Sequence, residues 1–298
     1  MNALLFPGQG VQKVGMLDFL ITSNSEVKNL IKSTSEVLDF DLLDLISNGP
    51  EEKINLTEYA QPAILASSVA IARSSDVIEK ISFTAGLSLG EYSALVYAEC
   101  IDFQDAIRLV NTRGRLMQNA VPEGTAGMLV ILNMPLSEIA IMIEKINESG
   151  KIIDFSTDNA DGVSVLAGTN SAIETCIKYI ENGDFRRVKT QLIKMSVPSH
   201  CFLLESAQEE LAKLLNKIDF STPKIPVLPN VLALPTTDTS QIKEALINQL
   251  CSTVRWRESL EYLIKNDLKI IYDAGPEKTI ISMARKLKDI EKRSLLDI

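Results

Sequence analysis

The sequence predicts an α/β fold, in which helices cover both faces of a mostly parallel sheet and a small subdomain is inserted into the larger domain. Three observations support this prediction. Short apolar segments alternate with longer segments of helical period, which is typical of parallel strands joined by helices. A stretch in the middle of the chain has its own order of strands and helices. A serine flanked by glycines separates one strand from the helix that follows it.

The elements of the large domain are expected in a regular alternation. The strands expected there are short apolar runs, at residues 4–6, 81–85 and 269–273. The expected helices are longer segments with apolar residues at helical spacing, at residues 18–38, 61 to about 78, 89–97, 105–121 and 278–287.

The middle stretch has the order β-α-β-β-α-β of a ferredoxin-like unit. Its strands are expected at residues 128–132, 152–155, 163–167 and 187–194, and its helices at 136–148 and from Asn170 or Ser171, as the capping residue, to 180. We therefore expect a large α/β-hydrolase-like domain formed by residues 1–123 and 197–298, and a small ferredoxin-like subdomain at 124–196. Because no linker rich in proline or glycine separates them, the two should share an interface.

One serine lies in the pattern of a nucleophile elbow. The box Gly86-Leu87-Ser88-Leu89-Gly90 follows an expected strand and precedes an expected helix. The glycines allow a sharp turn, and the free N–H groups of the helix N-terminus would point at the serine hydroxyl and at an oxyanion beside it. From the box alone, an ordinary strand-to-helix loop that contains a serine remains the alternative.

The chain contains one histidine, His200. A serine nucleophile needs a base, and imidazole is the usual one. His200 follows the last strand expected in the small subdomain, whereas Ser88 ends a strand of the large domain. The pair would therefore meet in a cleft between the domains, where substrates commonly bind. A surface position in the loop after Pro198 is the alternative.

The composition excludes several classes of protein. Hydrophobic residues make up 46% of the 298 residues, which indicates a folded aliphatic core, and a net charge of −9 argues against nucleic-acid binding. No apolar run reaches about 18 residues, and residues 1–6 lack the basic start of a signal peptide, so we expect a cytoplasmic protein that does not bind membranes. With one histidine and four widely spaced cysteines, we expect reduced thiols, no metal and no cofactor.

The chain resembles the malonyl-CoA:acyl carrier protein transacylases, the acyltransferases that load malonyl groups for bacterial fatty acid synthesis. The resemblance runs from Leu5 to about Leu287. Its landmarks in chain order are Phe6-Pro7-Gly8-Gln9-Gly10, Gln61-Pro62-Ala63, the serine box with Glu91-Tyr92-Ser93-Ala94-Leu95, Arg113-Gly114-Arg115-Leu116-Met117-Gln118, Val121-Pro122-Glu123-Gly124-Thr125, Val197-Pro198-Ser199-His200, Gln249-Leu250, Val254-Arg255-Trp256 and Ala274-Gly275-Pro276.

This resemblance implies the transfer of a malonyl group from malonyl-CoA to the phosphopantetheine thiol of acyl carrier protein, through a malonyl-serine intermediate. Ser88 would be the nucleophile and His200 its base. The resemblance also implies that the backbone carbonyl of Gln249 orients the imidazole. One oxyanion donor, the Leu89 backbone N–H, follows from elbow geometry, and the resemblance adds the backbone N–H of Gln9.

The resemblance matches Arg113 with the arginine that binds the malonyl carboxylate. A guanidinium pairs with a carboxylate through two parallel hydrogen bonds, whereas a neutral acetyl group would leave its charge unpaired. An exposed helix arginine is the alternative, and we favour it for Arg115. The sequence departs from the family at Leu87, where histidine is common, and at Glu277, where glycine is frequent.

Other functions remain open from the sequence. Stand-alone transacylases of polyketide pathways and acyl hydrolases share the implied fold, although Arg113 favours malonyl transfer. An ordinary α/β-hydrolase esterase fits less well, because about a hundred residues follow His200 and that fold keeps its histidine near the end. A scaffold that binds carrier protein without turnover is a distant alternative, against which the intact Ser88, His200 and Arg113 argue.

The implied partners require a local positive surface. Acyl carrier proteins are acidic and coenzyme A carries phosphates, so an acidic chain needs a basic patch to attract them. The candidates are Arg186, Arg187, Lys189 and Lys194 in the small subdomain, and Arg285, Lys286 and Lys288 near the C-terminus. A solvated face without a partner is the alternative.

Overall fold

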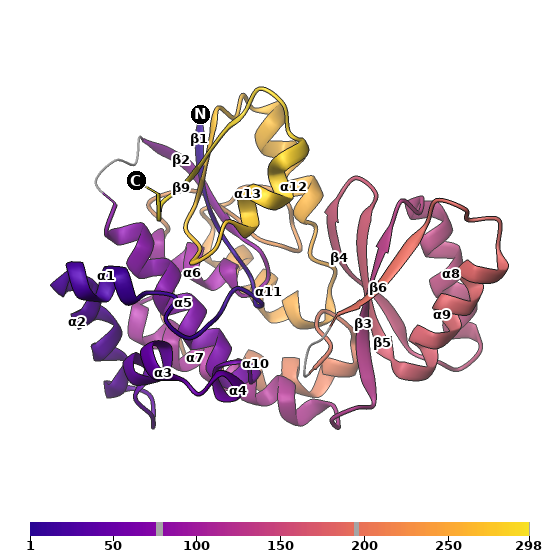
Figure 1. Cartoon of the computed structure of the whole chain (residues 1–298), viewed down its shortest axis with the longest axis horizontal. Helices are drawn as coiled ribbons and strands as arrows, with labels where there is room; N and C mark the ends of the chain where they lie inside the picture. The colour runs from indigo at the N-terminus through magenta and orange to yellow at the C-terminus, as the bar shows by residue number, and fades with distance from the viewer. Residues whose placement is uncertain (76–79, 194–196, 298) are drawn as a thin grey trace.

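The computed structural model describes residues 1–75, 80–193 and 197–297 (Figure 1). The helix end expected near residue 78 and the strand end expected at Lys194 lie outside these ranges. Within them, the structure confirms the predicted class: an α/β domain with a parallel sheet and a smaller domain with an antiparallel sheet.

A parallel sheet forms the centre of the large domain. Its described strands are β1 (Asn2–Phe6), β2 (Ile81–Gly86), β7 (Val227–Leu228), β8 (Ile270–Asp273) and β9 (Glu291–Ser294). They lie in the order β7-β2-β1-β8-β9, and each neighbouring pair is parallel. The two-residue strand β7 and the polar edge strand β9 were not predicted, because neither has the apolar run of a buried strand.

Helices cover both faces of this sheet (Figure 1). They are α1 (Asp18–Ser23), α2 (Ser25–Ser33), α3 (Leu42–Asn48), α4 (Glu51–Ile54), α5 (Thr57–Arg73), α6 (Gly90–Tyr97), α7 (Phe103–Ala120), α10 (Glu205–Leu215), α11 (Thr239–Asn248), α12 (Trp256–Lys265) and α13 (Thr279–Met283). Successive residues of β1 face opposite sides, so Leu4 and Phe6 join the core with α5, α6 and α7, whereas Leu5 joins the core with α12 and α13. None of the helices in the described ranges is both long and apolar enough to cross a membrane.

Two predicted helices are divided in the structure. The segment predicted as one helix at 18–38 breaks at Asn24, whose side chain caps α2 by accepting hydrogen bonds from the backbone N–H groups of Glu26 and Val27. The segment predicted at 278–287 is α13 followed by a short 3-10 turn. In both, apolar spacing continues across the break, so periodicity alone does not reveal it.

The small subdomain has the predicted order of elements. These are β3 (Ala126–Leu132), α8 (Leu136–Glu148), β4 (Ile153–Ala160), β5 (Val163–Thr169), α9 (Asn170–Asn182) and β6 (Lys189–Ile193). The antiparallel order β4-β5-β3-β6 is that of a ferredoxin-like sheet, and α8 and α9 cover its outer face (Figure 1). All of these elements fall within 124–196; those boundaries themselves stay a prediction.

The capping residue of α9 was predicted wrongly. Thr169, rather than Asn170 or Ser171, is the N-cap, and its hydroxyl accepts a hydrogen bond from the Ala172 backbone N–H at 3.3 Å. The Asn170 side chain instead donates to the Gly124 carbonyl at 2.6 Å. Because the Asn170 side chain is bonded to the start of the subdomain, it does not cap α9.

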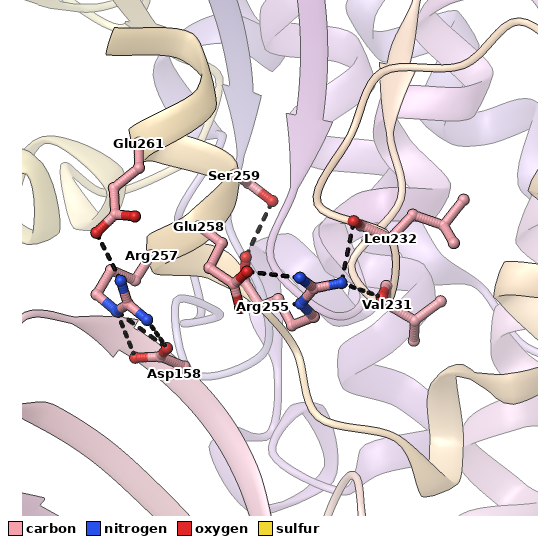
Figure 2. A network of polar contacts seen from close by, with 8 residues as sticks. All are labelled: Asp158, Val231, Leu232, Arg255, Arg257, Glu258, Ser259 and Glu261. Atoms are coloured by element: carbon pink, nitrogen blue, oxygen red, sulfur yellow. Dashed lines mark hydrogen bonds and ion pairs between the residues drawn. The ribbon is translucent and has the colours of Figure 1, made fainter. Parts of the chain in front are cut away.

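The two domains share the interface that the sequence predicts. A parallel bridge joins Thr157 of β4 to Val254, and the Asp158 N–H donates to the Val254 carbonyl at 2.9 Å. Figure 2 shows the Arg257 guanidinium between Asp158 of the small subdomain and Glu261 of its own helix. The Arg257 Nη2 to Asp158 Oδ2 distance is 2.8 Å, and Asp158 is buried. These contacts fix β4 against the chain that leads into α12.

Candidate active site

The box around Ser88 forms a sharp turn at the carboxyl end of the parallel sheet. The Leu87 N–H donates to the Phe6 carbonyl at 2.9 Å, which ties the turn to the end of β1. Glycine is required on both sides: a Cβ on Gly86 would lie 1.9 Å from the Gly90 carbonyl carbon, and one on Gly90 would lie 2.4 Å from the Phe6 oxygen. Ser88 itself has a φ of +52°. A non-glycine residue in this left-handed region at the start of a helix is the geometry of a nucleophile elbow.

His200 contacts Ser88 and Gln249 at once. Its Nε2 lies 2.7 Å from Ser88 Oγ, and its Nδ1 lies 2.8 Å from the Gln249 carbonyl oxygen. A carbonyl can only accept, so Nδ1 carries the proton, and in the neutral ring Nε2 accepts from the Ser88 hydroxyl. The loop of His200 is also held from the small subdomain, because the Ser156 hydroxyl of β4 donates to the Ser199 carbonyl at 2.7 Å.

The surroundings of His200 favour its neutral, basic form. Burial lowers the pKa of His200 from 6.5 to about 4, and the nearby positive charge of Arg113 acts in the same direction. The hydrogen bond to the Gln249 carbonyl works against this shift by stabilising the imidazolium. Desolvation is the larger effect, so the imidazole is ready to accept a proton at neutral pH.

Arg113 is a buried cation directed at Ser88. It is 1% exposed, and its Nη2 lies 3.5 Å from Ser88 Oγ and 3.0 Å from the side-chain oxygen of Gln249. Its Nη1 donates to the Gln61 side-chain oxygen at 2.9 Å, and the Tyr92 ring centroid lies 5.5 Å from its Cζ. Burial lowers the pKa of Arg113, but a guanidinium stays charged at neutral pH. Its fixed donors suit an anionic group close to the serine.

Close packing of α5 against α7 brings Arg113 to Gln61. At Gly114, the next residue of α7, a Cβ would lie 2.6 Å from the Thr57 carbonyl oxygen and 2.7 Å from the Glu58 Cα. The absent side chain therefore allows the two helices to approach closely. This contact sets the position of the buried guanidinium relative to the elbow.

The two backbone N–H groups predicted to bind an oxyanion flank Ser88. Leu89 follows the serine directly, and Gln9 follows Gly8, whose Cβ position lies only 2.7 Å from the Leu87 carbonyl oxygen. Among the described residues, neither the Leu89 nor the Gln9 N–H has a hydrogen-bond partner outside regular helix or strand bonds. The turn after β1 therefore lies against the elbow, and within the described ranges the backbone N–H groups of Gln9 and Leu89 remain free to bind an oxyanion.

A cavity of about 680 Å³ lies between the domains beside Leu87. Residues of both domains line it, among them Leu132, Asn159, Gly162, Lys278, Thr279, Met283, Arg285 and Lys286. Leu87 contributes an apolar wall where its relatives by resemblance commonly carry histidine, and it packs against the core around α12.

The predicted basic residues that the structure describes are exposed on the surfaces of the two domains. Arg285 and Lys286 line the 680 Å³ cavity, and Arg186 and Arg187 line a second, shallower hollow on the small subdomain. Lys189 and Lys288 are exposed, and Lys194 lies outside the described residues.

The structure brings together all six side chains or backbone groups that the sequence singles out: Ser88, His200, Arg113, Gln249, Gln9 and Leu89. Their catalytic and binding roles stay predictions. No sequence pattern predicts a role for Gln61, Glu91 or Asn230, although the first two lie in landmark motifs. Asn230 carries no motif that could have marked it.

Glu91 and Asn230 form a buried polar layer behind the elbow. Glu91 Oε2 accepts from the Asn230 backbone N–H at 3.0 Å and from the Gln249 side-chain amide at 2.8 Å. Burial raises the pKa of Glu91 to about 7, which these hydrogen bonds and the Arg113 charge oppose. The network therefore connects the helix after Ser88 to Gln249, whose carbonyl oxygen contacts His200.

Comparison with known proteins places this geometry in a family. The acyl transferase domain family matches residues 3–282. Malonyl CoA-acyl carrier protein transacylase from Haemophilus influenzae is 40% identical over 304 residues, which cover 99% of this chain and 95% of that protein. The enzyme of the same name from Escherichia coli K12 is 38% identical over 297 residues, covering 99% and 95%.

Solved structures show the same fold. An acyl carrier protein S-malonyltransferase from Vibrio cholerae superposes with a TM-score of 0.93 at 40% identity, covering 98% of this chain and 95% of that one. A malonyl-transacylase solved in complex with its type II PKS acyl carrier protein superposes with a TM-score of 0.92 at 38% identity, covering 98% and 94%.

The single imidazole should titrate far below the ordinary histidine range. Because burial and the Arg113 charge disfavour the imidazolium, the His200 proton resonances should shift with a midpoint near pH 4 rather than 6.5 in NMR spectra of the native protein. Arg113→Ala should raise this midpoint, since it removes a positive charge and admits water. The unfolded chain, as reference, should return a midpoint of about 6.5. A native midpoint at or above that of the unfolded chain would contradict this description of the site.

Proposed function

This chain belongs to the acyl transferase family, together with the malonyl-CoA–acyl carrier protein transacylases, and we propose that its Ser88 carries a malonyl group from coenzyme A to acyl carrier protein. One observation supports this role above the others. A serine within 2.7 Å of its base also lies 3.5 Å from a buried guanidinium. Such a site combines a nucleophile with an anchor for an acyl group that ends in a carboxylate.

In the first half of the reaction, the malonyl group passes from coenzyme A to Ser88, and coenzyme A leaves as a thiol. The Ser88 hydroxyl gives its proton to His200 Nε2 as its oxygen attacks the thioester carbonyl. The resulting oxyanion accepts hydrogen bonds from the backbone N–H groups of Leu89 and Gln9. The carbon–sulfur bond then breaks, the sulfur takes the proton from His200, and a malonyl-Ser88 ester remains.

In the second half, the phosphopantetheine thiol of acyl carrier protein attacks this ester. His200 takes the thiol proton, the same two N–H groups hold the second oxyanion, and the bond to Ser88 Oγ breaks. The serine oxygen recovers its proton from His200. The enzyme returns to its starting state, and the reaction requires no metal or redox cofactor.

Arg113 gives this chemistry its acyl selectivity. A malonyl carboxylate would pair with the guanidinium and hold the thioester carbonyl next to Ser88. It would also offset the charge that lowers the pKa of His200, which makes the imidazole a stronger base when the correct acyl group is present. An acetyl group provides neither effect, so a neutral acyl thioester meets an unpaired charge and a weaker base.

The cleft between the domains is the proposed path for both thioester partners. Arg285 and Lys286 line the cavity beside Leu87, and Arg186 and Arg187 line a separate hollow on the small subdomain. Phosphates of coenzyme A and acidic side chains of a carrier protein would find local positive charge there, despite the net charge of −9. We place the enzyme in the cytoplasm, where its four free thiols stay reduced.

The pathway has two candidates. The transacylase names of the curated relatives support a place in fatty acid synthesis, which we propose as the principal role. The 38% identity to a transacylase bound to a type II PKS carrier protein supports a polyketide role as the second candidate. Transfer rates to a purified carrier protein of each type, both from the source organism, separate the two.

The acyl-enzyme should be observable directly. Incubation of the protein with malonyl-CoA alone should add the mass of one malonyl group, because the malonyl-Ser88 ester persists when no acyl carrier protein thiol is present to accept the group. Intact-mass spectrometry measures this gain, and Ser88→Ala should abolish it. A folded wild-type protein that gains no mass would support a non-catalytic scaffold instead.

Removal of the guanidinium should change acyl selectivity. Arg113→Ala should raise the activation free energy for malonyl transfer by about 2–4 kcal/mol, since a charged, hydrogen-bonded anchor is lost. Acetyl transfer should fall far less or rise. Arg113→Lys should rescue malonyl transfer only in part, because a point charge cannot form two parallel hydrogen bonds.

The measurement is the ratio of kcat/KM values for malonyl-CoA and acetyl-CoA in each variant. The exposed Arg115→Ala on the same helix is the matched control and should leave this ratio unchanged. A ratio that Arg113→Ala does not alter would remove the basis for malonyl selectivity.

A further inference from the structure

Topology places Asn230 behind the serine. Strand β7 pairs in parallel with β2, with Ala85 opposite Leu228. The residues that follow these two strands therefore emerge at the same edge of the sheet. Ser88 is three residues beyond the Ala85 register and Asn230 is two beyond Leu228, and the Asn230 side chain is buried.

The Asn230 amide spans the elbow from side to side. Its Oδ1 accepts from the Ser88 backbone N–H at 2.7 Å, and its Nδ2 donates to the Gly86 carbonyl at 2.6 Å. Both partners are backbone groups on either side of Leu87, so the amide closes the turn as a backbone bond would in regular structure. The Ser88 N–H is thereby engaged, which leaves the Leu89 N–H to face an oxyanion.

The loop of Asn230 is itself held from behind. The Arg255 N–H donates to the Asn230 carbonyl at 2.9 Å. Figure 2 shows the Arg255 guanidinium reaching the Val231 and Leu232 carbonyls, with Nη1 to oxygen distances of 3.2 Å and 3.1 Å. Glu258 fixes the other side of that guanidinium. Asn230 is therefore a rigid support for the elbow.

The same residue connects Ser88 to the support of His200. The Asn230 N–H donates to Glu91, which accepts from the Gln249 side-chain amide, and that amide also donates to the Ser88 carbonyl at 3.1 Å. Gln249 in turn holds His200 through its backbone carbonyl at 2.8 Å. Nucleophile and base thus share one hydrogen-bonded frame.

We propose that Asn230 is a positioning residue of the transfer reaction: its side-chain amide holds the strained Ser88 backbone in the one orientation that presents the hydroxyl to His200. This inference rests on the proposed function. Ser88 has a φ of +52°, a conformation that persists only where surrounding contacts fix it. An amide is the side chain that both accepts from an N–H and donates to a carbonyl at this spacing, which neither a carboxylate nor an alkyl group can do.

Asn230→Ala should slow acylation of Ser88 without changing acyl selectivity. The backbone N–H of residue 230 still reaches Glu91 in this variant. The Gln249 amide loses its bond of 3.4 Å to Asn230 Oδ1 but keeps its shorter bonds to Glu91 and to the Ser88 carbonyl, so we expect Gln249 and Arg113 to keep their places. Single-turnover acylation should fall between about 10-fold and 100-fold, the range expected from a small displacement of a reacting atom. Malonyl-CoA and acetyl-CoA should lose the same factor, so the ratio of their kcat/KM values should stay that of the wild type. This result is distinct from the selectivity change expected for Arg113→Ala.

Thr84→Val is the matched control. The Thr84 hydroxyl lies buried on β2 and donates to the Leu4 carbonyl at 3.0 Å, so the variant also loses one buried side-chain bond to backbone close to the elbow. Its acylation rate should stay within about twofold of the wild type, while its loss in thermal stability should be comparable to that of Asn230→Ala. A purely structural role for Asn230 predicts that the two variants behave alike per folded molecule.

Asn230→Asp tests the donor half of the amide and covers a failure of the alanine variant to fold. An ionised carboxylate would repel the Gly86 carbonyl, whereas a protonated carboxyl can donate to it, and burial beside Glu91 raises the pKa of the new group. The acylation rate relative to wild type should therefore rise several-fold as pH falls from about 8 to about 6. A structural defect gives a ratio that does not depend on pH.

The outcomes separate this inference from the function on which it rests. If the wild type forms no malonyl-enzyme, the proposed function fails. If the wild type is acylated and Asn230→Ala is acylated within about twofold of its rate, or if the Asn230→Asp ratio does not change with pH, the positioning role is overturned while the function stands.

Discussion

The buried guanidinium of Arg113 is the charge around which the site is organised. An ion without a partner in a protein interior costs several kcal/mol, and here two amide oxygens, from Gln61 and Gln249, provide the compensation. These neutral acceptors bind Nη1 and Nη2 without cancelling the charge. The malonyl carboxylate that we propose to bind here can therefore still gain from pairing with the guanidinium, which a resident carboxylate in contact with Arg113 would prevent. The same charge adds to burial, which is the larger effect, in lowering the pKa of His200.

The fold explains why groups so distant in sequence meet at this point. Parallel strands place their carboxyl ends at one edge, so the turns after β1, β2 and β7 contribute Gln9, Ser88 and Asn230. The inserted subdomain returns the chain at His200, and β4 anchors that loop through Ser156. The small domain thus supports the base as well as forming one wall of the cleft.

Site residues that lie in a local sequence motif could be predicted, whereas residues that reach the site only through tertiary packing could not. Ser88 and His200 could be predicted because a glycine-flanked turn and a unique histidine carry local signals. Gln249 contacts His200 through its backbone carbonyl, so only the family resemblance pointed to it. Asn230 has no local signal: its partner Ser88 lies 142 positions away, and the two-residue strand before it is too short to recognise. The fold class was predictable for a similar reason, since apolar periodicity marks most of the strands and helices, although α10, α11 and α12 were not predicted. A cap such as Thr169 depends instead on which of several neighbouring side chains forms the local hydrogen bond.

The central claim is that His200, held by a backbone carbonyl and not by a carboxylate, is the base that activates Ser88. The most direct measurement is the single-turnover rate of Ser88 malonylation in His200→Ala, followed by rapid quenching and intact mass, with the fold checked by circular dichroism. Loss of the only imidazole should lower this rate by about 100-fold to 10,000-fold, because no second histidine can replace the base. A folded His200→Ala protein that is malonylated on Ser88 within about tenfold of the wild-type rate would contradict the account.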